Sequence, residues 1–256
     1  MKPVQLSTRT LQLRIGDRTL CQHLDLDVRA GECWGILGQN GTGKTTLLHT
    51  LAGLRPAQGG EIRLQQTPLA DLSRRDIARR LGLMPQDTSD AFPASVLETA
   101  LIGRHPYLSR WQWESAADLQ ITRDALVGTG LGGMEDRQVS TLSGGERRRL
   151  ALAALLVQAP PVMLLDEPAN HLDLRHQHDM FGLLQVRAGA GHAVLMVLHD
   201  INHALRYCDH VLLLFADGTT CSGPTVDLLE PTLLSELYEY PVTQIRERDR
   251  RLFIAG

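Results

Sequence analysis

The sequence predicts an α/β fold, with a parallel sheet as its core, an N-terminal antiparallel β subdomain and an inserted α-helical subdomain. Three observations predict this fold. Strand patterns open the chain, apolar strands alternate with helices on both sides of the middle, and helical patterns dominate the middle itself. Such alternation favours a parallel core over an all-β or an all-α fold.

The first thirty residues have the pattern of strands. Residues 11–15 and 24–28 alternate apolar and polar side chains with a period of two, and Gly16 and Asp17 provide a turn signal. We therefore expect this segment to form the antiparallel β subdomain.

The next elements place a glycine-rich loop between a strand and a helix. Residues 33–37 are apolar without alternation, as expected of a strand that is buried on both faces. Residues 44–52 have the pattern of a helix that stops near Gly53. A phosphate-binding loop requires this order of strand, loop and helix.

Helical patterns replace strand patterns between Asp71 and Gln158, for example over residues 115–127 and 146–157. Strand patterns return at residues 162–166, 193–198 and 211–215.

The length of 256 residues fits one large domain with an embedded subdomain. We expect a single domain over residues 1–256. Its catalytic core, with the β subdomain, takes about residues 1–86 and 160–256, and its helical subdomain takes about residues 87–159.

Composition and charge exclude several classes. Lys and Arg number 26 and Asp and Glu 29, and the net charge of -3 argues against a nucleic-acid binder driven by bulk charge. The first residues lack the apolar core of a signal peptide. The longest apolar runs, such as residues 151–157 and 211–216, are too short to cross a bilayer of ~30 Å. The four cysteines lack C-x-x-C spacing, which favours buried free thiols. We therefore expect a cytoplasmic chain that reaches a membrane only through a partner.

Residues 38–45 match the phosphate-binding pattern G-x-x-x-x-G-K-[ST]. Its glycines let backbone N–H groups turn inward around phosphates, where side chains would block their approach. Lys44 supplies positive charge to the β- and γ-phosphates, the Thr45 hydroxyl is placed to ligate Mg²⁺, and the following helix adds a favourable dipole. We expect nucleotide to be bound by Gly38, Gln39, Asn40, Gly41, Thr42, Gly43, Lys44, Thr45 and Thr46.

The apolar strand at residues 162–166 ends in two adjacent carboxylates. Asp166, the last strand residue, suits the surroundings of the Mg²⁺ ion. Glu167, one residue beyond, can face a water in line with the γ-phosphate and act as a general base or orient that water. Alone, such a strand end would more often simply meet solvent, but after a phosphate loop it indicates a catalytic pair.

Residues 142–146, with the sequence Leu-Ser-Gly-Gly-Glu, open another helix. Ser143 is a good N-cap and the paired glycines leave the first amides exposed, which makes this helix start an anion site. Because the chain already has a phosphate site at residues 38–45, the anion site at this helix start is expected to have a separate role. The arginines that follow, Arg147, Arg148 and Arg149, are predicted to form a solvated helix face.

Together these segments resemble the nucleotide-binding subunit of ABC transporters, and the likeness covers nearly the whole chain. In that family the phosphate loop of one subunit and the Ser-Gly-Gly segment of the other sandwich each ATP. The resemblance therefore implies a P-loop NTPase core of the RecA-like type, a homodimer with two shared sites, and ATP and Mg²⁺ as cofactors. It adds Ser143, Gly144 and Gly145 to the nucleotide-binding residues.

The same resemblance assigns three further residues. Gln86 matches the glutamine that joins the Mg²⁺ site to the membrane partner, and Asp173 falls in the aspartate loop that crosses the dimer. His199 matches the histidine that contacts the γ-phosphate. The catalytic residues are then Glu167, His199, Gln86 and Lys44, and the metal site is formed by Thr45, Gln86 and Asp166.

One position departs from the family. Its members usually stack an aromatic residue of the first β-hairpin on adenine, and the corresponding position here is Ile15. We expect apolar contact from Ile15 in place of stacking, which leaves base selectivity and affinity open.

Residues 90–107 resemble the importer subunits for ferric siderophores, haem and vitamin B12. In those proteins the segment after the glutamine loop forms part of the groove that receives the permease coupling helix. Phe92, Pro93 and Val96 are then either permease contacts or internal packing. Trp111 and Trp113 are either core residues or contacts at the rim. The resemblance implies a transmembrane permease, a substrate-binding protein in the same system, and a location at the cytoplasmic face of the membrane.

The leading hypothesis is an importer ATPase in which two copies bind two ATP and close, and closure moves the permease. The alternative is a soluble ABC ATPase without transport, acting on a scaffold such as iron–sulfur cluster assembly. It needs the same motifs, and only residues 103–106, Gly-Arg-His-Pro, favour the importer over it. A GTPase is disfavoured because the sequence has no N-K-x-D segment. The transported compound stays open.

Overall fold

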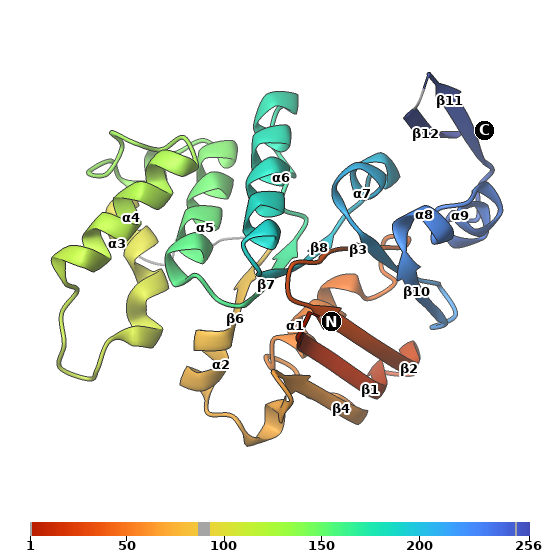
Figure 1. Ribbon diagram of the computed structural model, residues 1–256, viewed down its shortest axis with the longest axis horizontal. Coiled ribbons are helices and arrows are strands. Elements are labelled where there is room, and N and C mark those ends of the chain that lie inside the picture. Colours follow the sequence, from red (N-terminus) through yellow and green to blue (C-terminus); the bar gives the residue numbers. More distant parts are fainter. Residues whose placement is uncertain (1, 87–92, 249) are drawn as a thin grey trace.

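The computed structural model of the protein describes residues 2–86, 93–248 and 250–256. A six-stranded sheet with the order β10-β9-β3-β8-β7-β6 runs through the molecule (Figure 1). All its neighbours pair in parallel except β9 and β10. Its strands are β3 (Cys33–Leu37), β6 (Leu81–Met84), β7 (Val162–Asp166), β8 (Ala193–Val197), β9 (His210–Leu214) and β10 (Thr220–Pro224).

The central strands are buried on both faces, which explains their unbroken apolar sequences. In β7, Met163 and Leu165 belong to the core on one side of the sheet. Val162 and Leu164 belong to the core on the other side. The alternation expected of a half-buried strand is therefore absent, because both faces of the sheet are covered.

The N-terminal residues form an antiparallel sheet with the order β2-β1-β4-β5. Strands β1 (Val4–Ile15) and β2 (Arg18–Arg29) form a hairpin, and β4 (Gly59–Leu64) and β5 (Thr67–Pro68) extend the sheet. The predicted hairpin with its turn at Gly16 and Asp17 is confirmed, although its strands are longer than expected. Strands β4 and β5 were not predicted.

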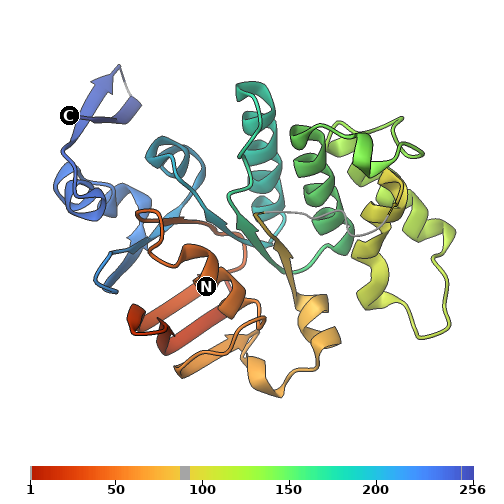
Figure 2. The ribbon, with the colours of Figure 1, turned by 180° about the vertical axis from the view of Figure 1, so that it is seen from behind.

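Helices cover the parallel sheet on both sides. Figures 1 and 2 show α5 and α6 on one side, and α1 with the antiparallel sheet on the other. The helices are α1 (Lys44–Leu51), α2 (Arg74–Arg80), α3 (Val96–Leu101), α4 (Ala116–Gly128), α5 (Gly144–Gln158), α6 (Leu174–Gly189), α7 (Ile201–Tyr207), α8 (Thr225–Leu228) and α9 (Pro231–Tyr238). The 3-10 turns are η1 (Leu69–Asp71), η2 (Ile102–Tyr107) and η3 (Val139–Thr141). A hairpin of β11 (Val242–Glu247) and β12 (Arg250–Ala255) ends the chain.

One strand of the core lies where helical patterns were expected to dominate. Strand β6 falls between Asp71 and Gln158 and pairs in parallel with β7. It has only four residues, too few for a periodic pattern to be read. Pairing with β7 decides its conformation, and it brings Gln86 to the edge of the sheet.

The segment from Pro93 to the start of α4 contains residues for which the sequence left two interpretations open. Trp111 and Trp113 are 88% and 86% exposed, so the interpretation of either as a core residue is wrong. Val96 is fully buried at the start of α3, so its prediction as a permease contact is wrong and it packs internally. Pro93 is exposed, and Phe92 lies outside the described residues.

A partly buried ion pair lies at the N-terminus of α4. Arg104 donates from Nε to Oδ1 of Asp118 at 2.7 Å. The backbone N–H and the hydroxyl of Ser115 donate to Oδ2 of Asp118 at 2.9 and 2.7 Å. The hydrogen bonds from Ser115, followed by Arg104, lower the pKa of Asp118 to about 2.

This arrangement predicts an acid-dependent loss of stability. Because the folded pKa lies below the ordinary value of 3.8, the stabilisation is complete above that value and is lost as pH falls toward about 2. When the pH falls from about 6 to about 3, the free energy of unfolding of the wild type should decrease by ~1 kcal/mol more than that of Asp118→Asn. Urea unfolding of both proteins at the two pH values measures the difference. Equal losses would contradict the role of Asp118.

Candidate functional site

The glycine-rich loop joins β3 to α1, as the strand–loop–helix order predicts. Gly43 has a φ of 98° at the N-cap of α1, and a Cβ there would lie 2.7 Å from Cδ1 of Leu20. A Cβ on Gly38 would lie 2.4 Å from the carbonyl oxygen of Leu214. Only glycine fits both positions without strain, as expected of a loop whose backbone must approach a phosphate closely.

Lys44 lies beneath this loop and is 6% exposed. Its ammonium donates to the carbonyl oxygens of Gly38 and Gln39 at 2.7 and 2.8 Å. Burial lowers the pKa of Lys44, and the nearby carboxylates of Glu167 and Asp166 oppose this effect. The loop therefore holds a positive charge at its centre, where a phosphate would be bound.

Asp166 ends β7 with a carboxylate that is completely buried. Neither of its oxygens makes a hydrogen bond of standard geometry with the described residues, although the Thr45 hydroxyl is close enough to lower its pKa. Burial has the larger effect and raises the pKa of Asp166. A buried carboxylate with free oxygens beside a hydroxyl offers the hard oxygen donors that Mg²⁺ prefers, so these residues fit a magnesium ion.

Glu167 follows in the left-handed backbone conformation, with a φ of 49°. Three side chains surround its carboxylate. Nε2 of Gln86 donates to Oε2 at 3.0 Å, Nε2 of His199 lies 2.5 Å from Oε1, and the Asn170 amide also donates to Oε2. These contacts hold the carboxylate in one orientation, as a general base or a water-orienting group requires.

These residues border one cavity of about 590 Å³. Its lining includes Ile15, Asn40, Gly41, Gly43, Lys44, Thr45, Thr46, Gln86, Glu167 and His199. The structure thus brings together, from distant parts of the sequence, most of the residues predicted for the nucleotide and catalytic sites. Gly38, Gln39, Thr42 and Asp166 do not line this cavity.

Two lining residues were missed by the sequence reasoning. Arg18 and Leu20 border the same cavity from the start of β2. Ile15 is 48% exposed and pairs with Arg18 across the hairpin. Since hairpin partners lie side by side, the turn at Gly16 and Asp17 was a signal that could have found Arg18.

The predicted residues Ser143, Gly144, Gly145 and Asp173 lie outside this cavity. Ser143 caps α5, accepting from the backbone N–H of Glu146 at 3.2 Å while Glu146 accepts from the N–H of Ser143 at 2.7 Å. Asp173 caps α6. Ser143, Gly144 and Asp173 are exposed. Within one chain, the two predicted phosphate sites therefore do not form a single cavity.

The predicted solvated arginine face is wrong for Arg148. This side chain is 6% exposed and donates to backbone carbonyls of both the Gln86 and the Glu167 segments. Helix α5 packs against β6, so a residue on that face meets protein instead of water. Arg147 and Arg149 are half-buried.

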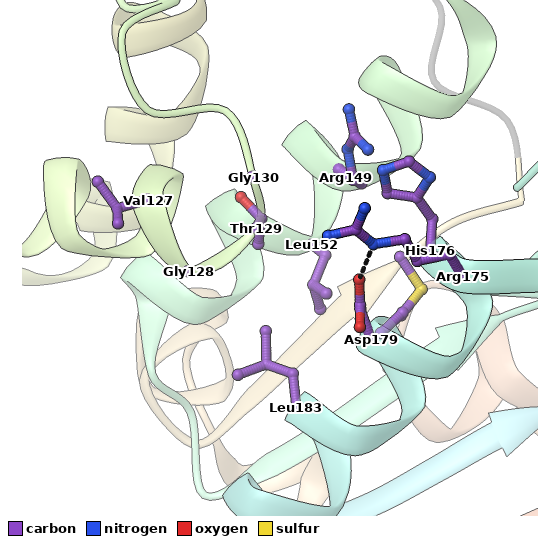
Figure 3. A pocket seen from close by; sticks show the side chains of 11 residues that line it. Val127, Gly128, Thr129, Gly130, Arg149, Leu152, Arg175, His176, Asp179 and Leu183 are labelled. Atoms are coloured by element: carbon purple, nitrogen blue, oxygen red, sulfur yellow. Dashed lines mark ion pairs between the residues drawn. The ribbon is translucent and has the colours of Figure 1, made fainter. Parts of the chain in front are cut away.

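A second cavity, of about 550 Å³, lies between α4, α5 and α6. Arg149, Arg175 and His176 gather on one side of it, and Asp179 pairs with Arg175 at 3.9 Å (Figure 3). It contains none of the residues predicted for nucleotide or catalysis, so the cavity at the glycine-rich loop is the candidate site.

Known proteins share this sequence and this fold. The sequence matches the ABC transporter family over residues 21–170, more than half of the chain. The hemin import ATP-binding protein HmuV of Streptomyces coelicolor is 41% identical over 234 residues, which cover 91% of this chain and 82% of HmuV. The iron(3+)-hydroxamate import ATP-binding protein FhuC of Bacillus subtilis is 31% identical, covering 91% of this chain and 87% of FhuC.

A solved structure described as a metal-chelate type ABC transporter in an inward-facing conformation resembles the whole chain. Its TM-score is 0.87 at 27% identity, and the match covers 99% of this chain and 98% of that one. The family match, the relatives and the shared fold agree with the order of motifs in the sequence. This chain therefore belongs to the ABC transporter family, as an ATP-binding subunit that hydrolyses ATP.

Proposed function

We propose that this chain powers the import of a metal chelate of the haem, ferric siderophore or cobalamin kind through a separate permease. The observation that carries the catalytic part is the position of Glu167. Gln86, Asn170 and His199 hold its carboxylate at the cavity that also contains Lys44. The import part is supported by the likeness to the haemin and hydroxamate import subunits.

In the proposed reaction the loop binds the triphosphate and Glu167 acts on water. The loop N–H groups and Lys44 would hold the β- and γ-phosphates. Thr45, Asp166 and Gln86 would hold Mg²⁺, which would neutralise phosphate charge. Glu167 orients or deprotonates the attacking water, and His199 contacts the γ-phosphate. Ile15, half exposed at the cavity, offers adenine an apolar contact.

We propose a homodimer with two shared ATP sites. The support is the exposure of Ser143 and Gly144, which do not line the cavity of their own chain. An exposed, capped helix start attracts an anion, and a second copy would supply it as bound nucleotide. Asp173, also exposed, would cross the same interface. Closure then excludes water from both sites and strengthens their electrostatic interactions.

We propose that the permease places the chain at the cytoplasmic face of the membrane, and that a substrate-binding protein serves the same system. Within the described residues, none of the helices combines the length and the hydropathy needed to cross a bilayer. The exposed Trp111 and Trp113 are candidates for the rim of the permease contact. The packing of α5 against α3 and α4 supports the proposed helical subdomain at about residues 87–159, with the core at about residues 1–86 and 160–256.

Deleting the gene for this chain tests the function. Uptake of labelled haemin, a ferric hydroxamate and cobalamin is then measured in the deletion strain. We expect loss of one uptake activity, restored by the wild-type chain and not by Glu167→Gln. Purification of the chain from detergent-solubilised membranes, followed by mass spectrometry, should recover a polytopic permease. Unchanged uptake of all three compounds together with only soluble scaffold partners would instead support the non-transport ATPase.

A further inference from the structure

The buried guanidinium of Arg148 donates hydrogen bonds to five backbone carbonyls from two separate segments. Arg148 donates from Nη1 to the carbonyl oxygens of Pro85 and Gln86 at 2.6 and 2.8 Å. Its Nη2 donates to the carbonyls of Asp166 and Glu167, the latter at 2.7 Å, and Nε donates to Pro168 at 3.1 Å. The side chain is 6% exposed, so these bonds replace its contacts with water.

A guanidinium suits this position because it is planar and carries several N–H donors in fixed directions. Here the carbonyl dipoles stabilise the buried charge, and the charge in turn fixes the carbonyls. An ammonium has three donors at a single point, so a lysine at position 148 would not span both segments. The arrangement therefore depends on arginine geometry as well as on positive charge.

The two segments carry the side chains that meet at the candidate catalytic position. Gln86 and Glu167 are joined through their side chains at 3.0 Å. Arg148 holds the carbonyl of each of these two residues. Glu167 also has a φ of 49°, a conformation that non-glycine residues adopt only when their surroundings impose it. Arg148 is thus in direct contact with the backbone that orients the Glu167 carboxylate.

Arg148 also lies on the helix that begins at Ser143. Helix α5 is capped at Ser143 and continues without interruption through Arg148 to Gln158. Five residues of helix span only ~7.5 Å at 1.5 Å per residue, so displacement at the capped end moves Arg148 as well. The guanidinium connects this helix start to Gln86 and Glu167 through its backbone contacts.

We propose that Arg148 is a positioning residue that couples the Ser143 end of α5 to the orientation of Glu167. A displacement of α5 then changes the position of the catalytic carboxylate through the five hydrogen bonds from Arg148 to backbone carbonyl oxygens. The proposal rests on the proposed roles of Glu167 and Gln86 in hydrolysis. It assigns Arg148 no contact with nucleotide, because Arg148 does not line the cavity.

Steady-state ATP hydrolysis and ATP binding by Arg148→Met and Arg148→Lys test this proposal. We expect kcat to fall about 10²-fold, the loss that ~1 Å of misplacement produces, while the Kd for ATP changes less than about twofold. Arg123→Met, which removes the same charge from an exposed position of α4, is the control and should retain wild-type kcat. Thermal unfolding shows whether each variant is folded. If Arg148→Met does not fold, the result for Arg148→Lys alone tests the proposal.

A double-mutant cycle separates positioning of Glu167 from a general structural effect. Single-turnover hydrolysis is measured for Glu167→Gln alone and combined with Arg148→Lys. If Arg148 acts through Glu167, the second substitution lowers the remaining rate by less than about threefold. A full additional loss, or wild-type kcat in Arg148→Lys, overturns the proposal. Normal turnover by Glu167→Gln alone would instead overturn the proposed role of Glu167.

Discussion

Lys44→Ala is expected to abolish tight ATP binding. Lys44 is buried beneath the glycine-rich loop, and it is the charged group that the loop surrounds. A hydrogen bond to a charged group contributes ~1.5–3 kcal/mol, so losing Lys44 should raise the Kd about 10- to 10²-fold. Equilibrium binding of a fluorescent ATP analogue measures this change.

The chain offers a matched control for this experiment. It contains only two lysines, Lys44 and Lys2, and Lys2 is exposed near the N-terminus. Lys2→Ala removes the same charge and should leave the Kd unchanged. Unchanged ATP affinity in Lys44→Ala would contradict the phosphate-loop assignment, whereas equal weakening in both variants would indicate an effect of net charge.

Glu167→Gln should almost eliminate hydrolysis while ATP still binds. The amide keeps the shape of the side chain but cannot accept a proton from water. General-base catalysis typically contributes ~10²–10⁴-fold, so phosphate release should fall within that range. Because bound ATP is no longer consumed, the proposed dimer should accumulate and be detected by size-exclusion chromatography with ATP and Mg²⁺.

Glu236→Gln provides the comparison, because Glu236 is exposed on α9, away from the cavity. It should hydrolyse ATP at the wild-type rate and show no ATP-dependent dimer accumulation. Wild-type phosphate release by Glu167→Gln would remove Glu167 from the mechanism. Slow hydrolysis with no dimer at any protein concentration would leave the catalytic role intact and contradict the shared sites.

Much of the site could be predicted from the sequence because its groups lie within short segments. The loop at residues 38–45 needs glycines and a lysine at fixed spacing, and the structure places it between β3 and α1. Ser143 and Glu146 form the capping box that a helix start requires, and both lie within four residues. Local backbone geometry determines such features, so the sequence contains their pattern.

Other features depended on packing between distant segments. Strand β6 becomes a strand because β7 is beside it, and its four residues carry too little pattern of their own. Val96 and Trp111 are both apolar, yet one is buried and the other is 88% exposed. Hydrophobicity shows which residues can be buried, but the neighbouring elements decide which ones are.

The sequence by itself determined the family and the phosphate-loop pattern, and it predicted the roles of Asp166 and Glu167, because each of these depends on residue types at fixed spacing. Only the tertiary structure decided how the Glu167 carboxylate is held and that Arg148 is buried beside it. Arg148 lies 62 residues from Gln86 in the chain. A charge predicted to be solvated becomes a buried hydrogen-bond donor when folding brings carbonyls from two distant segments around it.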